Sequence, residues 1–178
     1  MVYIILGTGF EPIEAVAPCD ILRRGGVEVK FAGIGGRLIR AAHGITVQAD
    51  CTVDEIEKDD LELIMLPGGM GGVQSMLGCE KVLELVRYAW ENGRFVTAIC
   101  AAPTILAKLR ITDGRKAVCY PGLEEKMGTA LMQDADAVRD GKLITGRAPG
   151  AAYEFGLALL AALKGEETAE NVKKGLVY

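Results

Sequence analysis

Cys100 is the residue of this sequence whose position best suits covalent chemistry. It follows the apolar run 95–99 and precedes Ala101-Ala102-Pro103, so it lies where a predicted strand turns into a predicted helix. A side chain at such a tight turn points outward, and the N–H groups at the start of the helix favour a thiolate. Ala101 stands where the hydrolase motif has glycine, so the arrangement matches a nucleophile elbow but the residue differs. We predict that Cys100 is a nucleophile whose thiol pKa lies below the ordinary value of about 8.5.

Glu14 is predicted to lie near the Cys100 thiol. It falls in the first turn of a helix expected over about residues 12–25. If the two groups are close and buried, they cannot both carry a negative charge, so Glu14 is expected to keep a proton at neutral pH. The alternative is structural, because a glutamate at this position also complements the helix dipole or caps the helix.

A glycine-rich loop supplies backbone N–H groups that can bind an oxyanion. Residues 67–72 follow a predicted strand at 61–66, and Gly68 and Gly69 allow a ligand to approach the backbone closely. Together with the N–H of Ala101, these free amides lie at the same edge of the predicted sheet as Cys100 and Glu14, which makes this edge the candidate site. Pro-Gly-Gly is also ordinary turn chemistry, so the loop alone does not establish a site.

The remaining cysteines and the single histidine fit structural roles. The chain has five cysteines and no C-x-x-C pair, which argues against a disulfide framework and against a zinc site. We therefore predict no metal, and His43 is read as a solvated residue of a turn beside Gly44. The other cysteines are given no catalytic role; they are Cys19, Cys51, Cys79 and Cys119.

Alternating strands and helices must position these groups. The apolar pattern predicts strands at 2–6, 27–32, 61–66, 95–99 and 117–119, and hairpins at 38–47, expected on a sheet edge, and 137–145. It predicts helices at about 12–25, from 77 to 92, and at 101–109, 150–163 and 167–174. Such alternation is typical of an α/β fold, here a flavodoxin-like three-layer sandwich with a mostly parallel sheet and helices on both faces. Ligands bind at the carboxyl ends of such strands, where the three candidate loops meet.

Length and charge limit the class of protein. The 178 residues, half of them apolar, are enough for one domain, which we place at 1–178. The net charge of −4 is spread along the chain, which argues against a nucleic-acid surface or an anionic membrane as partner. The N-terminus has no basic segment before its first apolar run, so a secretory signal is not expected and a cytoplasmic location is predicted.

Four motifs resemble the ThiJ/PfpI superfamily. They are Leu66-Pro-Gly-Gly-Met70, Ala98-Ile-Cys-Ala-Ala-Pro103, Phe10-Glu-Pro-Ile-Glu-Ala15 and Gly146-Arg-Ala-Pro-Gly150. Their order and the chain length are similar to the branch that contains the parkinsonism-associated protein deglycase and the YajL-type chaperone. The resemblance implies a flavodoxin-like sandwich and a homodimer. It also implies that Cys100 is the reactive cysteine, Glu14 its protonated neighbour, and the Gly68 and Gly69 amides are near the oxyanion.

The sequence departs from some superfamily members after the cysteine. Those members have a histidine about 20 residues downstream, where this chain has Tyr120. Tyrosine, with a pKa near 10, is a poor base at neutral pH, so a peptidase is the least supported interpretation. Tyr120 and Arg147 are kept as possible auxiliary residues. Arg147 is interpreted either as orienting a substrate carbonyl or as closing a loop.

Two classes of function remain open. The leading hypothesis is a cofactor-free enzyme that acts on reactive dicarbonyls such as methylglyoxal or on glycated proteins, as a glutathione-independent glyoxalase or a deglycase. Cys100 would add to the aldehyde, the Gly69 and Ala101 amides would hold the oxyanion, and Glu14 would carry the proton. The alternative is a redox sensor or holdase chaperone in which Cys100 is oxidised without turnover. The true substrate and physiological role stay open.

Overall fold

A seven-stranded sheet forms the middle layer of the molecule. The computed structural model describes residues 1–177, so Tyr178, the last residue of the predicted domain, lies outside the described residues. The strand order is β10-β11-β7-β6-β1-β2-β5, and every pairing is parallel except that of β10 with β11. The strands are β1 (Val2–Leu6), β2 (Val29–Gly33), β5 (Cys51–Thr52), β6 (Leu63–Leu66), β7 (Phe95–Ile99), β10 (Ala137–Asp140) and β11 (Leu143–Gly146).

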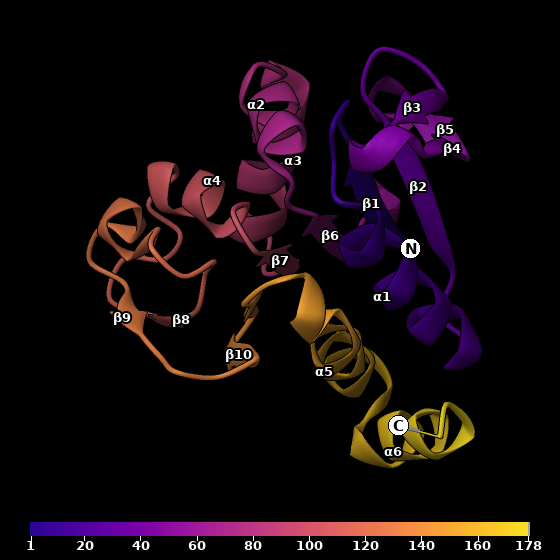
Figure 1. Ribbon diagram of the computed structural model, residues 1–178, viewed down its shortest axis with the longest axis vertical. Helices are drawn as coiled ribbons and strands as arrows, with labels where there is room; N and C mark the ends of the chain where they lie inside the picture. The colour runs from indigo at the N-terminus through magenta and orange to yellow at the C-terminus, as the bar shows by residue number, and fades with distance from the viewer. Residues whose placement is uncertain (178) are drawn as a thin grey trace.

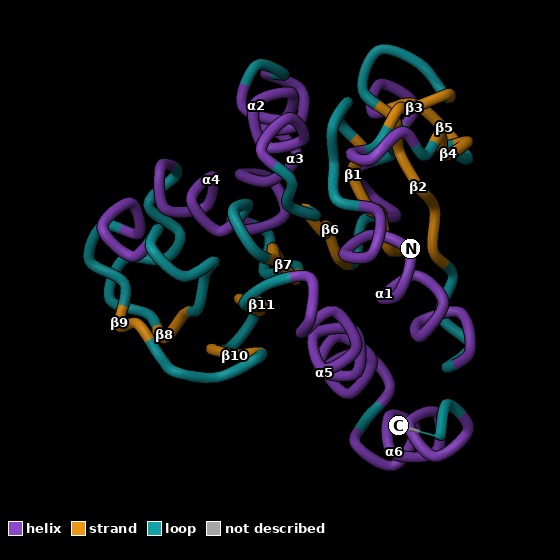
Figure 2. Tube along the Cα trace, in the orientation of Figure 1, coloured by secondary structure: helices purple, strands orange, loops and turns teal. Residues whose placement is uncertain are grey.

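Helices cover both faces of this sheet (Figures 1 and 2). One face carries α1 (Pro12–Arg24) and α5 (Ala152–Lys164), with α6 (Glu166–Gly175) packed on α5. The other face carries α2 (Met70–Leu77), α3 (Glu80–Glu91) and α4 (Pro103–Lys108). The predicted α/β fold with a mostly parallel sheet is therefore confirmed. None of the helices between residues 1 and 177 is long and apolar enough to cross a lipid bilayer.

The central strands are buried because their sequences are almost entirely apolar. All residues of β1, β6 and β7 are buried, as expected for parallel strands with helices on both faces. Thr97 is the polar exception within β7, and its hydroxyl donates a hydrogen bond to the carbonyl of Ile64 at 3.1 Å. Neighbouring β1, β6 and β7 end at the same edge, so the loops that follow them converge.

Several expected elements differ in the structure. The hairpin predicted at 38–47 is a separate two-stranded sheet, β3 (Leu38–Arg40) with β4 (Thr46–Gln48), and β5 occupies the sheet edge instead. The strand predicted at 117–119 is β8 (Lys116–Ala117), which pairs with β9 (Leu131–Met132) outside the central sheet. These short segments carry too few apolar residues for their partners to be identified from pattern alone.

The predicted loop at 67–72 is shorter than expected. Helix α2 occupies Met70–Leu77 and was not predicted, whereas the helix predicted from Leu77 to Asn92 is α3, which begins at Glu80. Gly72 belongs to α2 because the helix packs directly on the first loop: a Cβ at this position would lie 2.7 Å from Phe10 Cα. Close packing against another segment thus outweighs the low helix propensity of glycine.

Candidate active site

Cys100 adopts the strained backbone of a strand-to-helix turn. Its φ is +66°, a left-handed conformation that is uncommon for residues other than glycine. Two hydrogen bonds hold this turn: the Cys100 N–H donates to the Gly146 carbonyl at 2.9 Å, and the Cys100 carbonyl accepts from the Tyr120 N–H at 2.8 Å. The residue is 8% exposed. The predicted elbow is present, and it is fixed by β11 on one side and by the segment after β8 on the other.

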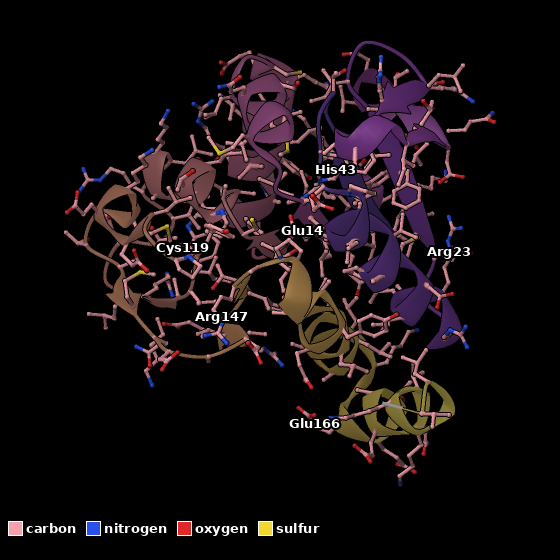
Figure 3. All side chains as sticks on the ribbon, in the orientation of Figure 1. Glu14, Arg23, His43, Cys119, Arg147 and Glu166 are labelled. Carbon is pink, nitrogen blue, oxygen red and sulfur yellow. The ribbon has the colours of Figure 1, made fainter. Side chains whose placement is uncertain are left out.

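Glu14 lies buried in the centre of the molecule, against the loop that follows β6 (Figure 3). Its Oε2 accepts a hydrogen bond from the Gly68 N–H at 2.7 Å, and the carboxyl also forms a hydrogen bond with the Cys100 thiol. A Cβ built on Gly68 would lie 2.6 Å from Glu14 Oε2 and 2.8 Å from Cys100 Cβ. Gly68 therefore allows the carboxyl and the thiol to approach one another from two different elements.

The environment of Glu14 favours its protonated form. Burial, and then the negative charge of Glu11, raise the pKa of Glu14 from 4.5 to about 7, although hydrogen bonds from Cys100 and Gly68 lower it. Its Oε1 is also buried and accepts no hydrogen bond from a nitrogen or oxygen donor in the described chain. The direction expected from the sequence is confirmed, and a carboxyl with a pKa near 7 is suited to transferring protons at neutral pH.

The expectation of a lowered Cys100 pKa is wrong. Burial, and then the charge of Glu14, raise the pKa of the Cys100 thiol to about 12; hydrogen bonds from the Ala101 and Gly69 N–H groups lower it but do not compensate. The helix after the elbow also has less influence than predicted, since α4 spans only Pro103–Lys108 and begins after Ala102. A short helix that starts three residues after Cys100 offers little positive potential.

Cys100 and Glu14 therefore titrate as a pair. Below about pH 7 the pair holds two protons, and above it one, because two adjacent buried anions repel each other. The Ala101 and Gly69 N–H groups stabilise the thiolate form, and Glu14 is the group that can receive the proton. The arrangement provides a sulfur nucleophile together with the base that activates it.

The predicted oxyanion groups divide into two sets. The N–H groups of Gly69 and Ala101 face the Cys100 sulfur, where a developing oxyanion would form. The Gly68 N–H is instead used by Glu14, so this residue positions the carboxyl rather than the substrate. Gly69 also has a structural role that the sequence did not reveal: its φ is +79°, and a Cβ there would lie 2.5 Å from the Gly9 carbonyl oxygen. Gly69→Val is thus expected to destabilise the fold as well as the site.

The match to a known family agrees with this geometry. A model of the DJ-1/PfpI family matches residues 1–162. The chain belongs to the DJ-1/PfpI family.

Relatives in the DJ-1/PfpI family match almost the whole chain. Protein dj-1beta of Drosophila melanogaster is 36% identical over 177 residues, covering 98% of this chain and 95% of the relative. Its crystal structure matches with a TM-score of 0.93 at 34% identity, over 99% of this chain and 96% of that one. A Caenorhabditis elegans relative named glutathione-independent glyoxalase DJR-1.2 is 30% identical over 93% of this chain and 89% of its own. The structure of Toxoplasma gondii DJ-1, described as oxidized, matches with a TM-score of 0.95 at 29% identity, over 99% and 97% of the two chains.

Tyr120 and Arg147, the two auxiliary residues of this DJ-1/PfpI protein, have different surroundings. Tyr120 contacts the elbow through its backbone N–H, which donates to the Cys100 carbonyl. The residue as a whole is 46% exposed. Arg147 forms ion pairs with Asp134 and Asp136, and its N–H also donates to the Asp136 carbonyl. These contacts favour the interpretation that Arg147 closes the loop before β10 over the one in which it orients a substrate carbonyl.

Glu11 and His43 were not assigned to the site from the sequence, yet they lie beside it. His43 Nε2 is 3.5 Å from Glu11 Oε2; the imidazole is 77% exposed and the Glu11 side chain 14% exposed. In the view of Figure 3, His43 lies just above Glu14. Glu11 precedes Glu14 by three residues, and this spacing places both on one side of a helical turn. The spacing is the sequence feature from which the position of Glu11 beside the site could have been predicted. His43 is a turn residue, as predicted, with φ of +60°.

Metal ligands do not gather anywhere in residues 1–177. No group of three or more His, Cys, Asp or Glu side chains is arranged to hold a metal ion there. The backbone N–H groups that face Cys100 suit an oxyanion rather than a cation.

The raised pKa of Glu14 predicts that the folded protein loses stability as pH rises. The folded-state pKa of about 7 exceeds the ordinary value of 4.5, so the folded protein binds this proton more tightly than the unfolded chain does. The stabilisation of the folded protein by this proton is complete below pH 4.5 and is lost once the pH exceeds about 7. The free energy of unfolding that is lost amounts to about 3 kcal/mol. The free energy of unfolding, measured with urea between pH 4.5 and 8, is expected to fall by this amount relative to Glu14→Gln. An identical pH dependence in both proteins would contradict the assignment.

Proposed function

We propose that this DJ-1/PfpI protein is a cofactor-independent enzyme for reactive dicarbonyls, of the glutathione-independent glyoxalase or protein deglycase type. The observation that carries the proposal is the pairing of Cys100 with Glu14, a carboxyl whose pKa of about 7 fits general acid and base work. The C. elegans relative named glutathione-independent glyoxalase supports the same chemistry. The proposed substrates are small aldehydes such as methylglyoxal, or their early adducts on proteins.

The first proposed step is addition of Cys100 to the aldehyde. A bond forms between the sulfur and the aldehyde carbon, and the π electron pair of the carbonyl moves to its oxygen. Glu14 accepts the thiol proton and passes it to that oxygen, giving a hemithioacetal. The Gly69 and Ala101 N–H groups, which face the sulfur, stabilise the negative charge while it develops.

The second proposed step is an internal redox reaction that needs no external oxidant. Glu14 removes the proton from the former aldehyde carbon and returns it to the neighbouring ketone carbon, while the hydroxyl proton of the hemithioacetal moves to the ketone oxygen. The first carbon is thereby oxidised to a thioester carbonyl, and the ketone is reduced to a hydroxyl-bearing carbon. The product is a thioester of an α-hydroxy acid on Cys100. Water then cleaves the carbon–sulfur bond, which releases the hydroxy acid and restores the thiol.

The proposal is tested by incubating the purified protein with methylglyoxal in the presence of a chelator and without glutathione. Consumption of methylglyoxal together with stoichiometric formation of lactate is the expected result. A glycated peptide offered in the same buffer separates the two activities, because a deglycase releases the free amine. Absence of both products would exclude the enzyme proposal.

Oxidation of Cys100 without turnover is the second candidate function. It is supported by the protonated carboxyl beside the sulfur and by the relative whose structure is described as oxidized. Cys100 would gain two oxygens under peroxide, forming a sulfinic acid that accepts a hydrogen bond from the Glu14 carboxyl. A sensor or holdase chaperone would use this state as its signal.

Glu14 is expected to control how far Cys100 oxidises. In a peroxide titration the wild-type protein should stop at the sulfinic acid, whereas Glu14→Leu should pass beyond it or oxidise more slowly, because the hydrogen bond is lost. Intact-mass spectra record the added oxygens. If Glu14 serves only its own helix, the two sets of spectra will be identical and the stability loss will be about 1 kcal/mol or less.

The remaining assignments are also proposals. A homodimer fits the exposed apolar side chains Ile13 and Val16 on α1, which are 52% and 45% exposed. A cytoplasmic location, a single domain, and the absence of cofactor, nucleic-acid and membrane partners remain predictions from the sequence. A peptidase is the least supported function, because the one imidazole of the chain lies against Glu11 rather than Cys100.

A further inference from the structure

An apolar groove begins beside the nucleophile and lies between α2, α4 and the short 3-10 helix Glu124–Met127. Its volume is about 370 Å³, within the range of small-molecule sites. Figure 1 shows α2 and α4 on the same side of the sheet, so the groove opens on the face opposite α1 and α5. Its apolar walls are formed by Met70, Val73, Leu77, Ala101 and Leu123.

The groove lies next to Cys100 through Ala101, the following residue, which lines it; Cys100 and Gly69 do not line it. The N–H groups of Gly69 and Ala101 face the sulfur; Ala101 itself lines the groove, and Met70 directly follows Gly69. A molecule held on Cys100 must extend past Ala101 to enter this groove. Thr104 also lines the groove, but its hydroxyl is bound to the Ala101 carbonyl at 2.7 Å.

Two lysines give the rim of this groove a positive charge. Lys108 and Lys126 are exposed and line the groove, and neither ammonium group has an ion pair within residues 1–177. The neighbouring Glu124 is turned toward its own loop, where its carboxylate accepts a hydrogen bond from the Gly122 N–H at 2.8 Å. Apolar walls with two unpaired cations at the rim suit a ligand with an apolar body and an anionic end.

We propose that this groove binds the remote part of the substrate, and that the preferred dicarbonyl is an α-oxoaldehyde whose apolar substituent ends in a carboxylate. The inference rests on the proposed function for the reacting end of the molecule. Methylglyoxal carries only a methyl group and leaves such a groove empty. A longer substituent gains apolar burial along Val73 and Leu77 and places its carboxylate near Lys108 and Lys126.

The first test compares kcat/KM for methylglyoxal, phenylglyoxal and 4-carboxyphenylglyoxal. The wild-type protein is expected to prefer the carboxylated compound over phenylglyoxal by roughly fivefold, since two exposed lysines each contribute modestly. The double variant Lys108→Ala/Lys126→Ala should lose this preference and keep its rate with methylglyoxal. Met70→Glu, which places a negative charge at an exposed groove position, should reverse the preference. Lys164→Ala, an exposed lysine at the end of α5, is the matched control.

The second test does not depend on turnover. The rate of alkylation of Cys100 is measured by peptide mass spectrometry with N-phenyl iodoacetamide and with 4-(iodoacetamido)benzoate. A faster reaction of the carboxylated reagent, abolished in Lys108→Ala/Lys126→Ala but not in Lys164→Ala, supports the groove even if no dicarbonyl is consumed. Equal rates for both reagents, or a preference that survives in the double variant, overturn it whether or not the protein is a glyoxalase.

Discussion

Cys100→Ala is expected to abolish the conversion of methylglyoxal to lactate, with a loss in kcat/KM of roughly 10³-fold or more. The reason is that the sulfur forms the covalent intermediate, and alanine offers neither a nucleophile nor a partner for the Glu14 proton. The backbone turn should persist, because the hydrogen bonds to Gly146 and from Tyr120 involve only the main chain of residue 100. Lactate formation in the absence of glutathione is the measurement.

A matched control is Cys119→Ala. This cysteine is also buried, at 3% exposure, and its thiol pKa is also raised, to about 11, by burial and then by the charge of Glu124. The same chemical change is thus made without touching the pair of Cys100 and Glu14. Full activity is expected. Equal losses in the two variants would attribute the effect to stability, and retained activity in Cys100→Ala would refute the nucleophile.

Glu14→Gln is expected to lower kcat roughly 10²- to 10⁴-fold and to remove the pH dependence near neutrality. In the wild-type protein, activity should rise with pH through about 7, because Glu14 must be ionised to accept the thiol proton and the acidic form of the pair already holds two protons. Glutamine can still accept the Gly68 hydrogen bond, so the loop after β6 stays in place. Initial rates measured from pH 5 to 9 give both quantities.

Glu11→Gln provides the control for charge. The negative charge of Glu11 contributes to the raised pKa of Glu14, so its removal should shift the midpoint of the pH profile to lower pH. Activity above the midpoint should survive, since Glu11 carries no proton in the proposed reaction. A Glu14→Gln variant that follows the wild-type profile would show that another group activates the thiol.

The sequence was sufficient to predict the middle of the fold. Strands β1, β6 and β7 were predicted nearly to the residue because each is a mostly apolar run that ends at glycine, proline or Cys100. In a parallel sheet such strands end at one edge, so the meeting of Glu14, the Gly68 loop and Cys100 also followed from the pattern. Short strands such as β8 and β5 were misplaced or missed, because two residues carry no periodicity.

Only the tertiary structure decided the ionisation of the site. From the chain alone, the turn at Cys100 suggested a lowered thiol pKa, whereas the folded protein raises it through burial and the charge of Glu14. The same packing assigned the Gly68 N–H to Glu14 and brought His43 against Glu11. Local sequence determines which groups a strand or turn presents. Desolvation and charge interactions depend on segments far apart in the chain, so their balance is set only when those segments pack together.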